Sequence, residues 1–221
     1  MAAPLVLLAL AAAGAYLFTS TSSSESENEN AAKPPASSMS IDPSKLNALL
    51  PGSLGRVGDY VVSGSHPELI ELPPLDVAMR LANLHNNLIT PWRVVSGQLT
   101  ITSGYRNKKL NAAIGGADSS QHTTGEAADI KAQPGLRAAD IAEDLIELVT
   151  ESKKTVRPVQ FDQLIAYHPN QGGHCHVSLR GPDRGPNRGE FLVKLYNGKY
   201  AKGRTYAETL AILRDDVAKY S

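Results

Sequence analysis

The sequence contains a single cysteine among its 221 residues, which excludes an internal disulfide. Aromatic residues make up only 5% of the composition, and the 22 basic residues are balanced by 22 acidic ones. A chain without net charge has no general attraction for nucleic acid, so we expect no nucleic-acid partner. With 42% hydrophobic residues, it can still form one ordinary globular domain with extensions.

Charged side chains are absent from the start of the chain, where the first is Glu25. The stretch from Ala2 to Phe18 is rich in Ala and Leu, and residues 1–18 are predicted to be a signal peptide or an N-terminal membrane anchor. A basic start, usual in signal peptides, is missing, and a buried helix of the domain is the third alternative. Export or anchoring would place the domain in the cell envelope or periplasm, with membrane contact through this segment.

Residues 19–44 are dominated by Ser, Glu, Asn, Ala and Pro and show no apolar period. Such a composition cannot bury a core, so we expect a disordered tether. The remaining residues, 45–221, are expected to form one domain, loosely structured over 46–73, with its motifs at 75–180 and a C-terminal hairpin and helix at 190–220.

The apolar pattern of the domain alternates between helical and strand periods. We expect helices at 75–89, 108–114, 136–149 and after Thr205, and strands at 99–102, 127–130, 161–167 and 174–179. Pro91 is expected to close the first helix, Asn197-Gly198 to form a primed hairpin turn, and the residues from Thr205 to Glu208 a capping box. The fold class is therefore α+β, with a small, mainly antiparallel sheet and flanking helices.

The segment SQHTTGEAAD at 120–129 places His122 and Asp129 seven residues apart. On one helix their side chains would be separated by about 10 Å of rise, so both reach one metal ion only if the chain turns, as Gly125 allows. His174 and His176 lie two apart on an expected strand and share a face. Zinc held by two imidazoles and one carboxylate, with a position left for water, is a hydrolytic arrangement.

Cys175 lies between those histidines, and strand alternation points its side chain to the opposite face. We therefore expect a packed thiol rather than a metal ligand. The other histidines, His66, His85 and His168, lie in loops or beside a helix stripe, and we assign no function to them.

These motifs resemble those of the M15 metallopeptidases, particularly the zinc D-Ala-D-Ala carboxypeptidase branch. Four blocks occur in the family's order between Leu75 and Leu179: SGYRN at 103–107, SQHTTGEAAD at 120–129, FDQLI at 161–165 and HVS at 176–178. The resemblance implies the M15/Hedgehog-like zinc peptidase fold and one Zn²⁺ per chain, held by His122, Asp129 and His176.

The same resemblance implies further roles. Arg106 matches the arginine that faces the substrate, where a planar guanidinium suits a carboxylate or an oxyanion. Ser120 and Tyr105 are implied to contact the substrate as well.

At the positions where relatives carry an acidic residue near the site, the chain departs from the family pattern. Several branches have an acidic residue three positions before the last zinc histidine or after the DQLI strand, where this chain has Gly173 and Ala166-Tyr167. We expect His174 to transfer the proton, although a structural role for it remains open. Asp162 is the nearest acidic candidate, but it is expected to orient or pack near the strand.

The resemblance implies a zinc peptidase acting on peptidoglycan stem peptides, most simply a D-Ala-D-Ala-type carboxypeptidase. One alternative is a peptidoglycan endopeptidase of the kind that phages carry as a lysin, in which case the chain would be a virion component. The other is a zinc-containing cell-wall-binding module that has lost catalysis.

Overall fold

The computed structural model describes residues 41–220, and the signal or anchor predicted at 1–18 and most of the predicted tether lie outside this range. The described residues form one compact unit. Its centre is a six-stranded sheet in the order β1-β2-β4-β3-β5-β6. The strands are β1 (Thr100–Ser103), β2 (Ala127–Lys131), β3 (Gln163–Tyr167), β4 (Cys175–Ser178), β5 (Glu190–Lys194) and β6 (Tyr200–Ala201).

The sheet is mixed but mainly antiparallel, as the sequence predicts. Only β3 and β5 run parallel, and every other neighbouring pair is antiparallel. A segment must cross between two parallel neighbours, and here β4 and the loop after it make that crossing. Helices and sheet together confirm the α+β class.

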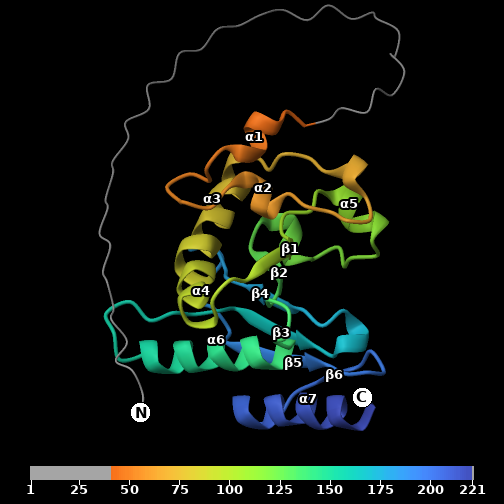
Figure 1. Cartoon of the computed structure of the whole chain (residues 1–221). Helices are drawn as coiled ribbons and strands as arrows, with labels where there is room; N and C mark the ends of the chain where they lie inside the picture. Colours follow the sequence, from red (N-terminus) through yellow and green to blue (C-terminus); the bar gives the residue numbers. More distant parts are fainter. Residues whose placement is uncertain (1–40, 221) are drawn as a thin grey trace, which may run out of the picture. The chain divides into compact units, whose positions relative to one another are not determined.

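The helices lie on both sides of this sheet (Figure 1). They are α1 (Pro43–Asn47), α2 (Val57–Tyr60), α3 (Leu75–Leu84), α4 (Thr90–Ser96), α5 (Lys108–Ala113), α6 (Ala138–Ser152) and α7 (Tyr206–Tyr220), with the 3-10 turns η1 (Pro67–Leu69), η3 (Gln121–Thr124) and η4 (Pro169–Gln171) and the π-helix η2 (His85–Ile89). None of the helices between residues 41 and 220 has the length and apolar character needed to cross a membrane.

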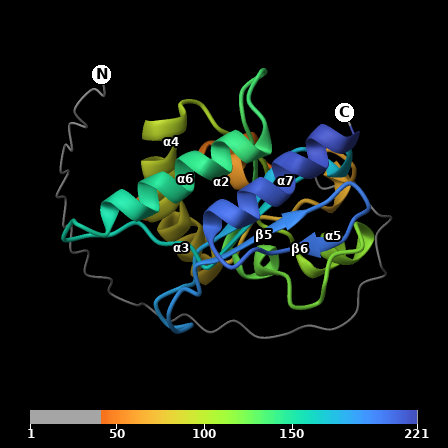
Figure 2. The same ribbon diagram turned by 90° about the horizontal axis from the view of Figure 1, so that it is seen from below.

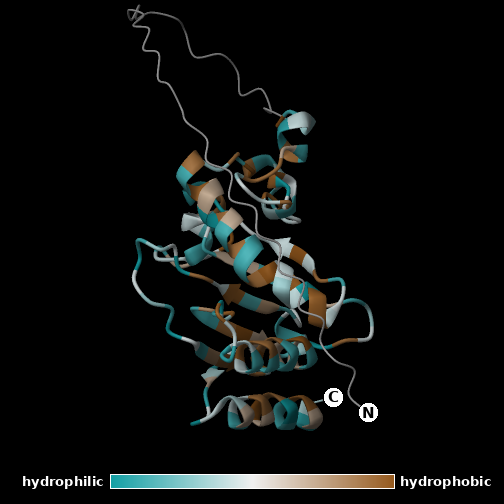
Figure 3. Cartoon of the chain, turned by 90° about the vertical axis from the view of Figure 1, so that its left-hand side faces the viewer, coloured by the Kyte–Doolittle hydropathy of each residue, from teal (hydrophilic) through white to brown (hydrophobic). Residues whose placement is uncertain are grey.

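One face of the sheet forms the core with α6 and α7, which run side by side across it (Figure 2). Ile130, Cys175, Ala166 and Val193 follow one another across four strands on this face, and all are fully buried. The two helices alternate hydrophobic and hydrophilic residues along their length (Figure 3), as helices covering a sheet do. Because this face is apolar, the polar motif residues occupy the other.

The first long helix continues past Pro91, contrary to our prediction. It runs from α3 through η2 into α4. Within η2, the Thr90 N–H bonds to the carbonyl of His85, five residues back, and Pro91 falls in the first turn of α4. Proline is tolerated there because it stands in the first turn of α4, next to the change in hydrogen-bond register. The extension brings Trp92 onto α6, where its Nε1 donates to the carbonyl of Ile141 at 2.9 Å.

The segment before α3 is better anchored than its Gly- and Pro-rich sequence suggests. Tyr60, at the end of α2, is fully buried, and its hydroxyl lies 2.9 Å from Nδ1 of His85. Its carbonyl accepts a hydrogen bond from the N–H of Tyr105 at 2.7 Å. These contacts tie residues 57–61 to the start of the motif region.

The structure confirms the predicted C-terminal hairpin, but the prediction of a primed turn within it is wrong. The Gly198 N–H donates to Leu195 O and the Leu195 N–H to Lys199 O, both at 2.9 Å. Among the described residues only glycines have positive φ, so Asn197 does not take the left-handed conformation that a type I′ turn needs at both central positions. Gly198, at φ 77°, takes it alone.

The capping box before α7 forms only in half. Thr205 Oγ1 accepts from the Glu208 N–H at 3.1 Å, as predicted. The Glu208 carboxylate, however, accepts from the N–H of Arg204 at 2.8 Å, one residue before the cap. An additional ion pair from the Arg204 side chain to the same carboxylate favours this arrangement.

Candidate metal centre

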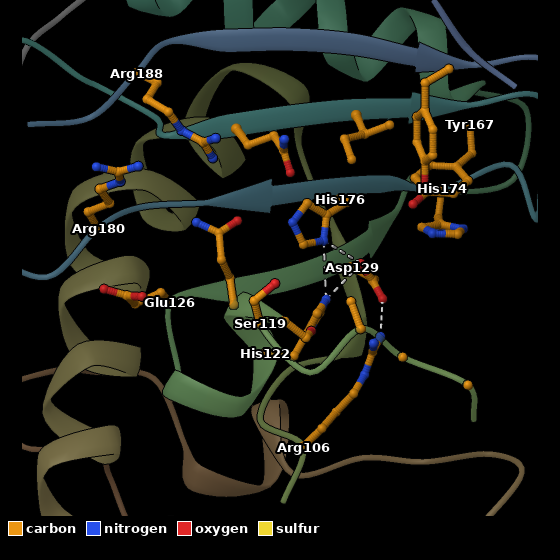
Figure 4. A pocket seen from close by; sticks show the side chains of 18 of the residues that line it. Arg106, Ser119, His122, Glu126, Asp129, Tyr167, His174, His176, Arg180 and Arg188 are labelled. Carbon is orange, nitrogen blue, oxygen red and sulfur yellow. Dashed lines mark hydrogen bonds and ion pairs between the residues drawn. The ribbon is translucent and has the colours of Figure 1, made fainter. Parts of the chain in front are cut away.

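Three side chains from three elements meet on the polar face of the sheet (Figure 4). His122 lies in η3, Asp129 in β2 and His176 in β4. The antiparallel register sets Asp129 directly opposite His176, so their side chains leave the sheet side by side. Nε2 of His122 lies 3.2 Å from Oδ1 of Asp129 and 3.1 Å from Nδ1 of His176, and that nitrogen lies 3.1 Å from the same carboxylate oxygen.

A tight turn brings His122 over the sheet. Gly125 ends η3 in the left-handed conformation, at φ 74°, and lets the chain reverse into β2. A Cβ on Gly125 would lie 2.7 Å from both the carbonyl oxygen and a methyl carbon of Val77 in α3. Glycine is therefore required both by the backbone angle and by the packing of the loop on α3, and the predicted turn between His122 and Asp129 is present.

The three donor atoms fit a zinc ion. Bonds of about 2.0–2.1 Å to a tetrahedral centre put neighbouring donors about 3.3 Å apart. The observed separations of 3.1–3.2 Å form a nearly equilateral triangle close to that spacing. Within residues 41–220, no other group of three histidine, cysteine or acidic side chains converges in this way.

Neighbouring groups fix the orientation of the donors. The Gly104 carbonyl lies 2.7 Å from Nδ1 of His122 and accepts a hydrogen bond from the Nδ1–H, which leaves Nε2 free to bind a metal. Arg106 donates to Oδ2 of Asp129 and, through Nε, to Ser103 Oγ at 2.8 Å. One polar atom of each candidate ligand therefore faces the centre. Hydrogen bonds hold the other side-chain atom of His122 and Asp129, and the sheet holds the backbone of His176.

The charge states also suit metal binding. Burial opposes ionisation of Asp129, but the charge of His122 and hydrogen bonds from His122 and His176 outweigh it and hold the pKa of Asp129 well below its usual range. Burial lowers the pKa of His176, which favours the neutral ring. Metal ligands must be deprotonated, so an ionised carboxylate beside a neutral imidazole is prepared for a cation.

Residues 79–161 match the family model described as Peptidase M15. This match supports an M15-type peptidase domain. M15 peptidases are metallopeptidases, in agreement with the donor triangle, two of whose members lie inside the matched range. His176 lies beyond that range and is brought to the centre by the pairing of β2 with β4. No curated protein matches the chain.

The candidate metal centre opens into a pocket of about 870 Å³. The three ligand candidates line it together with Arg106, Ser120 and His174, all expected at the site. The ring of His174 stacks on Tyr167 with centroids 4.1 Å apart. A pocket of this size accommodates a short peptide next to the metal centre.

Tyr105 does not line the pocket, contrary to the expectation that it contacts substrate. Its side chain is 9% exposed and belongs to the hydrophobic core. The backbone hydrogen bond to Tyr60 holds Tyr105 with its ring in that core while the next residue, Arg106, enters the pocket. Consecutive residues of an extended segment point to opposite sides, so only one of the two can face substrate.

The remaining histidines and the cysteine lie away from the centre, as expected. His66 is paired with Glu68 at 3.1 Å, His85 is buried against Tyr60, and His168 caps η4. The Cys175 thiol is fully buried on the opposite face and donates to Ala138 O at 3.2 Å.

Three arginines of the pocket, Arg180, Arg184 and Arg188, were missed by the sequence reasoning. They lie in the loop between β4 and β5, whose sequence RGPDRGPNRG at 180–189 repeats an arginine every four residues. That repeat is the signal that could have revealed them. Asp162, weighed only as a possible base, is fully buried and binds two of these arginines.

Proposed function

We propose that this chain is a zinc-dependent peptidase that hydrolyses peptidoglycan stem peptides as a D-Ala-D-Ala-type carboxypeptidase. The observation that supports it is the nearly equilateral donor triangle of His122, Asp129 and His176 at the base of an open pocket in an M15 domain. The substrate class follows from the motif resemblance, and the hydrolytic chemistry follows from the donor set.

When bound by these residues, zinc activates water and polarises a carbonyl group. His122, Asp129 and His176 would hold the ion on one side and leave the pocket side open for a peptide. Arg106 lines the same pocket and is only 13% exposed, so its guanidinium acts in a partly dehydrated setting where charge stabilisation is strong. We assign it to the negative charge that develops on the substrate carbonyl oxygen or to the terminal carboxylate.

His174 is the proton-transfer group of this proposal. It precedes β4, faces the pocket two residues before His176, and carries an imidazole whose pKa burial lowers, so the ring is neutral near pH 7. The alternative base, Asp162, is occupied by Arg188, Arg180 and Gln121. A carboxylate with all these partners has no free lone pair directed at substrate.

The role of His174 is tested by His174→Ala. We expect full zinc content with turnover lowered by roughly 10² to 10⁴, the range for a positioned proton-transfer group. His168→Ala serves as the matched control, because that histidine caps η4 outside the pocket. Unchanged turnover in His174→Ala would move the base elsewhere.

The activity itself is tested by incubating the purified protein with muropeptides and analysing the products by mass spectrometry. Release of one D-alanine, abolished by a chelator and restored by zinc, is the expected result. Cleavage within a cross-link or nearer the glycan would indicate the endopeptidase instead. Binding of peptidoglycan without any metal-dependent cleavage would indicate the non-catalytic module.

A further inference from the structure

The loop 180–189, which joins β4 to β5, lines one wall of the pocket with arginines. Arg180, Arg184 and Arg188 all face the same cavity as the metal centre. Their spacing of four residues comes from the tandem RGPD and RGPN units. Three guanidinium groups on one wall form a positively charged surface that the resemblance to M15 enzymes did not predict.

Buried carboxylates fix this loop at both ends. Asp162 is fully buried and accepts from the Arg188 N–H at 3.0 Å and from its guanidinium Nη2 at 2.6 Å. At the other end, Glu126, 2% exposed, accepts from the Gly181 N–H at 2.9 Å. The arginines are therefore presented from an anchored segment, which limits the entropy lost when they bind a ligand.

The nearby carboxylates do not use all the arginine donors. Asp162 pairs with both Arg180, at 2.8 Å, and Arg188. Arg188 has a second carboxylate partner in Glu190, at 3.4 Å, whereas Arg180 pairs only with the shared Asp162 among the described residues. The nearest carboxylate oxygen to Arg184 is on Glu126 at 3.9 Å, beyond hydrogen-bond distance, and the Arg184 side chain is 51% exposed. Arg184 thus carries an available guanidinium, with Arg180 beside it.

The arginine wall begins a short way along the chain from the metal centre. Arg180 follows His176 by four residues, or about 13 Å of extended chain. Figure 4 shows Arg180 and Arg188 on one side of His176, with His174 and Tyr167 on the other. An extended peptide with its cleaved bond at the metal would reach this wall a few residues away from that bond.

We propose that Arg180 and Arg184 form a carboxylate-binding subsite, and that the enzyme prefers peptides with a free carboxylate two to four residues before the cleaved bond. This inference rests on the proposed carboxypeptidase function, because only one residue then lies beyond the bond and the distant subsite must hold the preceding ones. A planar guanidinium pairs bidentately with a carboxylate, whereas a carboxamide cannot accept such a charge-assisted pair.

The test uses pairs of synthetic peptides that end in D-Ala-D-Ala and differ only by a carboxylate or a carboxamide on the residue two, three or four positions before the bond. We expect at least one pair to show a kcat/KM about tenfold or more higher for the acid, the range of a charge-assisted hydrogen bond. Arg184→Gln should reduce that acid-to-amide ratio, and Arg184→Glu should invert it. Equal rates for all pairs in the unaltered protein would overturn the proposal.

Arg204→Gln is the matched control, because it removes the same charge from a side chain that is 93% exposed and lies outside the pocket. Its acid-to-amide ratio should equal that of the unaltered protein; an equal loss would mean that only net charge matters. Calorimetric binding of the same peptides to the zinc-free protein separates the two hypotheses. Selective acid binding without cleavage would support the subsite and refute the peptidase, and cleavage without selectivity would do the reverse.

Discussion

At the scale of single residues, the central feature is that one strand position separates a candidate metal ligand from a buried thiol. His176 and Cys175 are consecutive in β4, yet one joins the donor triangle and the other is buried on the core face. Burial raises the pKa of the Cys175 thiol, which keeps it protonated and poorly suited to metal binding.

The ligand assignment predicts opposite results for two variants. His122→Ala removes one of three protein ligands and should abolish stoichiometric zinc binding. Cys175→Ser should retain one zinc per chain, because the side chain points away from the centre. Metal analysis of the purified proteins decides the matter: full zinc in the first variant, or loss in a folded second one, contradicts the assignment.

The second prediction concerns Arg106 and separates two possible roles: contact with the substrate and orientation of Asp129. Arg106→Lys keeps the charge but loses the planar fork that contacts Asp129 and Ser103. We expect turnover to fall on the order of 10² or more. If Arg106 acts on the substrate, zinc affinity stays normal; if it mainly orients Asp129, zinc affinity falls together with turnover.

Zinc titration of this variant beside its kinetics distinguishes those cases. Arg204→Lys, at an exposed position outside the pocket, is the control and should change neither quantity. Normal turnover in Arg106→Lys would show that neither contact is needed.

At the scale of elements, the loop 180–189 depends on one buried carboxylate. Burial opposes the ionisation of Asp162, but hydrogen bonds from Arg188 and Gln121 prevail and lower its pKa. A group whose pKa is depressed on folding contributes stability above its unfolded value of about 4, and that contribution is lost as pH falls through the folded pKa.

Asp162→Asn should therefore lower the free energy of unfolding at pH 7 by about 2 kcal/mol or more, since buried donors lose their charged partner. The difference from the unaltered protein should shrink as pH falls below the unfolded value of about 4 and through the lowered pKa of folded Asp162. Denaturant unfolding at pH 7 and across this acidic range measures the change. Asp183→Asn, an exposed position in the same loop, is the control, and an equal loss there would rule out a specific role for Asp162.

The elements that the sequence predicts well are those with a clear hydrophobic period. The helix around Ile141 and the strands holding Asp129 and His176 appear close to their expected positions. The predicted helix end at Pro91 was wrong because the π-helix η2 shifts the hydrogen-bond register just before the proline. Such a shift cannot be read from the spacing of apolar residues. The prediction of a primed turn at Asn197 was wrong because the hairpin adopts a different turn, in which only Gly198 takes the left-handed conformation.

The site was predictable to the extent that its residues occur in motifs. His122, Asp129 and His176 were identified from spacing and resemblance, and the structure brings them together. Tyr105 was misplaced because a motif gives no side-chain direction. The arginines of 180–189 were overlooked because they lie in a polar loop, and only the folded structure brings them to the pocket of the metal centre.

At the scale of the whole molecule, we propose that the domain acts outside the cytoplasm, as an exported, membrane-anchored or virion-borne enzyme, because an apolar segment and a polar tether precede it in the sequence. A chain beginning at Ile41 should be soluble, fold with the same thermal midpoint as the full chain and bind one zinc, since the described residues form a compact unit. Thermal unfolding and metal analysis test this. Aggregation or loss of zinc would mean that residues 1–40 pack against the domain.

Because the sole cysteine is buried, its chemical labelling can be used to follow unfolding of the core. Cys175 is fully enclosed between the sheet and α6, so a thiol-specific reagent gains access only when that packing opens. The rate of labelling in the native buffer then measures the opening equilibrium of the core directly. For the same reason, a cysteine introduced on the surface can be given a fluorescent probe without removing the natural one.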